Sequence, residues 1–118
     1  MKVIVAGSRT ITDYEVVKRI LLNHLDEISM LISGCAKGVD THGLLFAHEY
    51  NIPTTKDKFK ITKEEWRKYG KQARHLRNLK MGKEGEKLIA IHEKGSRGTQ
   101  DMINIMRDFG KPVVHYKL

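Results

Sequence analysis

The chain has 118 residues, of which 40% are hydrophobic and only two are proline, a composition typical of one folded domain with a real core and not of a disordered chain. Its single cysteine, Cys35, excludes an internal disulfide and favours a cytoplasmic location. The net charge of +8 favours anionic partners.

The first element in chain order is a strand. Residues 2–7 ("KVIVAG") form an apolar run that predicts a buried strand. The run reaches a Gly-Ser-Arg turn too early to be a signal-peptide core or a membrane span, so we expect no membrane association. Thr12 and Glu15 then predict a capping box at the start of a helix. That helix is indicated by apolar residues at helical spacing: Tyr14, Val17, Leu21 and Leu25.

The next segments continue the alternation of strand and helix. Residues 29–33 ("SMLIS") predict a second strand, and the apolar face over residues 39–50 predicts a second helix. A weak third strand is expected near residues 52–56 ("IPTTK").

A long polar segment over residues 61–83 predicts helix, with Gly70 as its expected break. Thr62 and Glu65 form a second capping-box signature, and Ile61 is placed to staple against Trp66. Twelve of the 22 Lys and Arg residues lie between positions 56 and 87, against five acidic residues, so the positive charge is concentrated in this region.

The last three elements complete a parallel sheet. Residues 87–92 ("KLIAIH") and 112–116 ("PVVHY") predict strands, and residues 99–109 predict a helix that Gly110 and Pro112 end. Strands that alternate with helices predict an α/β, Rossmann-like three-layer sandwich over residues 1–118, with a mostly parallel five-stranded sheet in the order 3-2-1-4-5. A ligand should then bind beyond the carboxyl ends of strands one and four, where the strand order reverses.

Two loops with the same Gly-Ser-Arg sequence leave those two strands. Backbone N–H groups, a hydroxyl and a guanidinium at one crevice are typical of a phosphate cradle, and a helix N-terminus behind the second loop also favours an anion. Either loop alone is equally well explained by a tight turn, whereas the pair favours a binding site. Arg97 points either into the crevice or outward. The cradle is predicted from these residues: Gly7, Ser8, Arg9, Gly95, Ser96, Gly98 and Thr99.

A third loop, "SGCAKGVD" over residues 33–40, follows the second strand. Gly34 and Gly38 are suited to turning the chain, and Asp40 falls in the first turn of a helix, where a carboxylate complements the helix dipole. Asp40 is also placed to touch a ligand, and the sequence leaves both readings open.

Several motifs in order resemble the YspA-like branch of the SLOG superfamily: "GSRT" from Gly7, "SGCAKGVD", Trp66 with "YGK", "RNLKM" from Arg77, and "GSRGTQDM" from Gly95. The resemblance spans nearly the whole chain. It implies a Rossmann-like domain that binds a nucleotide or a nucleotide-derived ligand, and it adds Gly34, Arg77 and Asn78 to the expected site. Cys35 and Arg74 stand where relatives commonly have glycine.

Two related groups supply the alternatives. The LOG phosphoribohydrolases resemble the chain at "RNLKM" and "GSRGT", which implies a nucleotide N-glycosidic hydrolase and a homodimer. Their catalytic glutamate falls on Met102, and Asp101 is one residue off, about 100° around the helix. The Rossmann domain of DNA-processing protein A resembles the first and third loops, which implies single-stranded nucleic-acid binding, with Trp66 as a stacking surface.

The chain offers no convincing catalytic triad or metal-binding cluster, because its six histidines are scattered. We therefore expect no cofactor and no metal. The favoured interpretation is a ligand-binding domain that binds nucleic acid only weakly.

Overall fold

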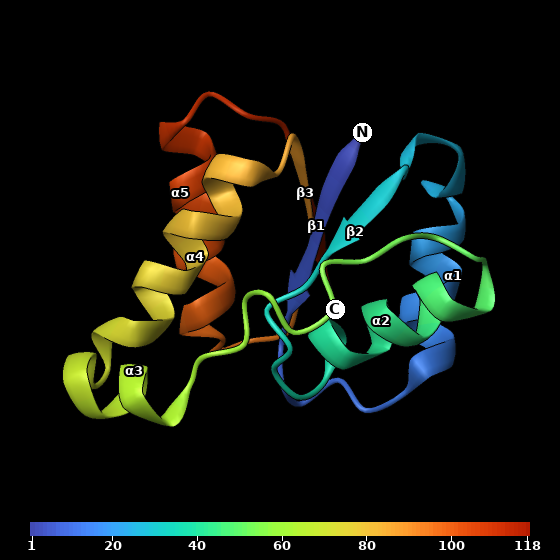
Figure 1. The fold of residues 1–118 in the computed structure, drawn as a ribbon. Helices are drawn as coiled ribbons and strands as arrows, with labels where there is room; N and C mark the ends of the chain where they lie inside the picture. The colour runs from blue at the N-terminus through green and yellow to red at the C-terminus, as the bar shows by residue number, and fades with distance from the viewer.

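The computed structural model describes residues 1–118 and shows strands and helices in alternation (Figure 1). In chain order the elements are β1 (Lys2–Gly7), α1 (Tyr14–Leu22), the 3-10 helix η1 (Leu25–Glu27), β2 (Met30–Ile32), α2 (Val39–Glu49), α3 (Lys63–Tyr69), α4 (Gln72–Glu84), β3 (Lys87–His92), α5 (Arg97–Asp108) and β4 (Val113–Lys117).

The sheet is parallel and has four strands in the order β2-β1-β3-β4. Ile4 of β1 aligns with Ile32 of β2 and with Leu88 of β3, so β1 and β3 are the two central strands. The prediction of a parallel α/β sheet is confirmed, and the prediction of five strands is wrong.

The expected strand near residues 52–56 is reduced to one bridge between Leu31 and Thr54. Pro53 has no N–H to donate, and its carbonyl accepts from Leu31 N at 2.9 Å. The backbone turns away on both sides of this bridge, because Asn51 (φ 57°) and Lys56 (φ 49°) adopt left-handed conformations. The segment therefore lies along β2 for too short a distance to become a fifth strand.

Alternate residues of β1 point to opposite faces of the sheet, as the pleat of a strand requires. Val3 and Val5 belong to a core cluster with Val17 of α1 and Phe46 of α2. Ile4 and its neighbours on the other face form a second cluster with residues of α4 and α5. Figure 1 shows the result, with α1 and α2 on one side of the sheet and α4 and α5 on the other.

The structure places the N-cap of α1 one residue later than predicted and confirms the predicted start and end of α3. α1 is capped by Asp13, whose side chain accepts from Glu15 N at 3.0 Å, so the predicted cap at Thr12 is one residue too early. The Thr62–Glu65 capping box is confirmed at the start of α3. Gly70 (φ 56°) separates α3 from α4, as its sequence position predicted.

None of the helices combines the length and the apolar character that crossing a bilayer requires.

Candidate functional site

A cavity of about 370 Å³ lies at the carboxyl ends of the two central strands. The chain returns from β2 to the other side of β1 through α3, α4 and β3, so the strand order reverses between β1 and β3. Ligands of open α/β sheets bind at such a reversal. The walls come from the loop after β1, the start of α2, α4, and the loop leading into α5.

The structure brings most of the predicted site residues to this cavity. Those that line it are Gly7, Ser8, Arg9, Asp40, Arg77, Asn78, Gly95, Ser96, Arg97, Gly98 and Thr99. Gly34 and Trp66 do not line it. Gly34 lies behind the wall, where its carbonyl accepts from Arg77 Nη1 at 3.2 Å.

The loop from β3 into α5 presents unused backbone donors. Gly95 (φ 89°) turns the chain, and α5 begins at Arg97, two residues earlier than predicted. Ser96 occupies the N-cap position, but its hydroxyl bonds to Thr99 Oγ1 at 2.6 Å and caps no backbone N–H. The N–H groups of Arg97, Gly98 and Thr99 consequently have no acceptor within the chain. Such a helix start favours an anion.

The glycines around the cavity serve different purposes. A Cβ at Gly7 would lie 2.1 Å from the Ile91 carbonyl oxygen, so this glycine is required for β1 and β3 to approach each other. Gly38 is required as well, because it combines a φ of 75° with close contact to the backbone of Ser8. Gly98 has no atom within 4 Å of its Cβ position. Neither the space around residue 98 nor its backbone conformation requires glycine at this position.

Ser8 is buried, and its hydroxyl is already engaged. Its Oγ accepts from Glu93 N at 2.7 Å and donates to the Glu93 carbonyl at 3.5 Å. Ser8 thus joins the loop after β1 to the loop after β3. This role is structural, and the sequence did not indicate it.

Three of the four arginines that line the cavity lie close enough for their charges to affect one another, and none of the three forms an ion pair with a carboxylate. Arg9, Arg74 and Arg77 all line the cavity, whereas every ion pair of the chain is made by a Lys or His side chain. Burial lowers the pKa of Arg77, as do the neighbouring charges of Arg74 and Arg9, while the Asp40 carboxylate opposes this shift. Burial and the charge of Arg9 also lower the pKa of Arg74. The like charges of these side chains repel one another.

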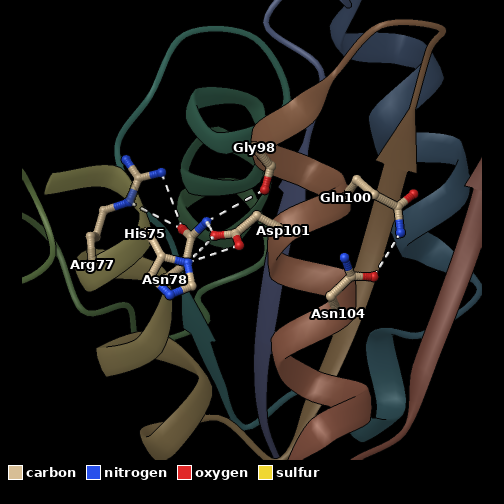
Figure 2. Close-up of polar contacts among 7 residues, drawn as sticks. All are labelled: His75, Arg77, Asn78, Gly98, Gln100, Asp101 and Asn104. Carbon is tan, nitrogen blue, oxygen red and sulfur yellow. Dashed lines mark hydrogen bonds and ion pairs between the residues drawn. The ribbon is translucent and has the colours of Figure 1, made fainter. Parts of the chain in front are cut away.

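A chain of hydrogen bonds connects Arg77 through Asn78 to Asp101 (Figure 2). Asn78 Oδ1 accepts from Arg77 Nη2 at 3.3 Å and from Nε at 3.4 Å. Asn78 Nδ2 donates to Asp101 Oδ2 at 3.0 Å and to the Gly98 carbonyl at 3.4 Å. His75 Nδ1 contacts both Asp101 oxygens, at 2.9 and 3.0 Å. The network links α4 to the first turn of α5.

Asp40 is the one acidic side chain in the cavity wall. It is 4% exposed and lies in the first turn of α2. Burial raises the pKa of Asp40 to about 6, while the charges of Arg77 and Arg9 and the N–H groups of Ala36 and Gly7 favour its ionised form. Both readings of this residue from the sequence therefore remain compatible with its position.

Cys35 and Trp66 lie near the cavity but outside its wall. Cys35 adopts a φ of 63°, a conformation that favours glycine. Trp66 is 38% exposed, and the Arg74 guanidinium lies 5.2 Å from the centroid of its ring. This cation–π contact places Arg74 between Trp66 and the cavity.

Sequence reasoning missed three contributors to the site. Arg74 and Lys94 line the cavity, and their positive charge beside the predicted loops was the available signal. Asp101 had no such signal, because its contact with Asn78 depends on how α5 packs on α4.

The sequence of this chain matches no protein-family model and no curated protein. Among solved structures, it is similar to the X-ray structure of DNA processing protein A from Streptococcus pneumoniae, with a TM-score of 0.57 and 19% sequence identity. The similarity covers 98% of this chain, which spans 58% of the other. At this identity the match shows a shared Rossmann-like fold.

Proposed function

We propose that the chain binds a nucleotide or a nucleotide-derived ligand, with a phosphate group held among Arg9, Arg74 and Arg77. The observation that supports this proposal is the convergence of three guanidinium groups on one cavity, with none of them paired to a carboxylate. Bringing like charges together costs free energy, and a bound anion offsets that cost.

The rest of the cavity fits the same ligand class. Lys94 and Arg97 add further positive charge, and the free N–H groups of residues 97–99 supply donors that suit phosphate oxygens. Ala6, Met81 and Met102 give the cavity apolar wall as well. The volume of about 370 Å³ lies within the range of small-molecule sites. The order of motifs supports placing the chain in the YspA-like branch of the SLOG superfamily.

A second candidate function is single-stranded nucleic-acid binding along α3. Trp66 is 38% exposed and Tyr69 is 41% exposed on this helix, and Arg67 and Lys68 are exposed between them. Exposed aromatic rings beside cations are typical of surfaces on which bases stack. The similar solved structure is that of a DNA processing protein, which favours the same candidate.

The first experiment is calorimetric titration of the chain with inorganic phosphate and with AMP. We expect binding, and we expect Arg9→Gln and Arg74→Gln each to weaken it about tenfold or more, because a charge-assisted hydrogen bond contributes about 1.5–3 kcal/mol. Arg107→Gln is the matched control, since Arg107 is exposed near the end of α5 and does not line the cavity. If neither probe binds, or if all three variants bind like the wild type, the proposal is wrong.

A further inference from the structure

A carboxylate such as that of Asp40 is not expected in the wall of a cavity that binds only phosphate. The other charged side chains of the wall are cations, and a carboxylate among them weakens their attraction for an anion. A place in the first turn of α2 does not explain its burial, because the interaction with the helix dipole is also available to an exposed side chain.

The local structure holds Asp40 at the wall. Ser33 Oγ donates to the Asp40 backbone carbonyl at 3.0 Å, which ties the end of β2 to the start of α2. A Cβ at Gly34 would lie 2.9 Å from Asp40 Oδ2 and 3.0 Å from Arg77 Cζ. Glycine at position 34 therefore leaves room for the carboxylate and the guanidinium side by side.

The carboxylate has fewer hydrogen bonds than it can accept. Its side chain accepts one within the chain, from Ala36 N at a long 3.4 Å, and the Gly7 N–H lies near enough to favour the ionised form. Arg77 makes no ion pair with it and donates to Gly34 and Asn78. An ionised carboxylate has about four acceptor sites, so Asp40 can accept further hydrogen bonds from a ligand in the cavity.

We propose that Asp40 accepts a hydrogen bond from a sugar hydroxyl of the bound ligand, so that the ligand is a phosphorylated sugar or a ribonucleotide. This inference rests on the proposed function above. The charges of Arg77 and Arg9 both act on Asp40, and a Cβ at Gly34 would lie within 3.0 Å of both the carboxylate and the Arg77 guanidinium, so the carboxylate lies close to the groups that would hold phosphate. The donor must then be only a few bonds from the phosphate, as a sugar hydroxyl is and an amino group of a base is not.

A hydrogen bond from a ligand hydroxyl to Asp40 would determine which phosphorylated ligands the site accepts. A site that hydrogen-bonds a hydroxyl rejects an analogue without it, because the buried acceptor is left unpaired. The sugars within a DNA strand carry no free hydroxyl, so such a strand would leave Asp40 without its donor. Asp40 thereby favours small ribose phosphates over DNA.

The test compares two base-free probes of equal charge, ribose 5-phosphate and its 1,2,3-trideoxy analogue, by calorimetry. We expect the wild type to bind ribose 5-phosphate about 10- to 100-fold more tightly, the range for a hydrogen bond to a charged group. In Asp40→Asn the two probes should bind with similar affinity, and inorganic phosphate should bind at least as tightly as to the wild type, because a negative charge has been removed.

The outcomes separate this inference from the function on which it rests. If the wild type binds both sugar phosphates equally well, the role of Asp40 is overturned while phosphate binding stands. If it binds neither probe and no inorganic phosphate, both proposals are overturned. An equal loss of affinity for all three probes in Asp40→Asn would show a purely structural role. Comparing the affinities of the two sugar phosphates for the wild type tests the role of Asp40 even if the Asp40→Asn variant does not fold.

Discussion

The Asp101 carboxylate, which lies outside the cavity, accepts a hydrogen bond from the side-chain amide of Asn78 in its wall at 3.0 Å. The same amide presents its oxygen to Arg77, so Asp101 fixes which way Asn78 faces and, through it, the guanidinium. We expect Asp101→Ala to weaken the binding of inorganic phosphate about tenfold, because Arg77 loses its orientation. Calorimetric titration measures the change.

His75→Ala is the matched control for that variant. His75 contacts Asp101 from the exposed side and leaves the Asn78 bond in place, so its removal should change phosphate affinity little. A double-mutant cycle adds a readout that a loss of stability would not give. In a chain that already carries Arg77→Met, adding Asp101→Ala should not weaken phosphate binding any further. Additive effects would mean that Asp101 does not act through Arg77.

Ser96→Asp should abolish phosphate binding while α5 stays intact. Aspartate is a preferred N-cap residue and would cap N–H groups that Ser96 leaves free, so the free energy of unfolding should not fall. Its charge would repel a phosphate at the same place. Ser96→Asn is the neutral comparison, since it caps equally well and adds no charge. Unchanged phosphate affinity in Ser96→Asp would remove this loop from the site.

The sequence predicted the two central strands and their loops because these depend on local patterns. The apolar runs of β1 and β3 and the Gly-Ser-Arg turns after them are read directly from neighbouring residues. The predicted fifth strand did not form, because the four residues between the left-handed residues Asn51 and Lys56 are too few to extend a ladder. The Asp101–Asn78 bond could not be predicted, since it arises only when α5 packs on α4.

The stability of the chain should depend on pH through Asp40. Burial raises its pKa from 3.8 to about 6 against the opposing charges of Arg77 and Arg9, so the folded state binds this proton more tightly than the unfolded state. The contribution is fully present below about pH 4 and is lost as the pH rises through 6. The total is on the order of 3 kcal/mol.

Denaturant unfolding of the wild type and of Asp40→Asn at several values between pH 4 and pH 7 tests this dependence. The variant has no titrating group at position 40, so the stability difference between the two proteins should shift in favour of the variant as the pH rises. The Cys35 thiol also lies near Asp40, but burial raises its pKa, so it does not titrate in this range. Parallel stability curves would contradict the prediction.

The chain should release little free base from nucleoside monophosphates. Met102 lines the cavity and stands at the sequence position where the resemblance to the phosphoribohydrolases would place a glutamate, and a thioether cannot stabilise a developing cation. Asp101 does not substitute, because its carboxylate faces Asn78 and His75. Chromatography of the reaction mixture measures free base. Rapid release that is lost in Arg77→Met would make the chain an enzyme instead.

The final prediction separates a small ligand from a nucleic-acid strand. If α3 and the turn after it follow a strand backbone, oligonucleotide affinity should fall steeply with salt, with a slope of about 0.7 per phosphate contact. Replacing Arg67, Lys68 and Lys71 together by Ala would then lower that slope by about 2. We expect instead weak oligonucleotide binding that the triple variant reduces, and an unchanged affinity for AMP, because none of these three residues lines the cavity.

The control for this experiment removes the same charge at exposed residues that lie outside α3 and do not line the cavity: Arg19, Arg107 and Lys117. It should leave AMP affinity unchanged and reduce oligonucleotide binding less than the α3 variant, because net charge alone has only a general effect. Trp66 is the single tryptophan, so its fluorescence reports directly on α3. Tight oligonucleotide binding at physiological salt, with Trp66 quenched by base stacking and the control variant unaffected, would favour strand binding over the nucleotide site.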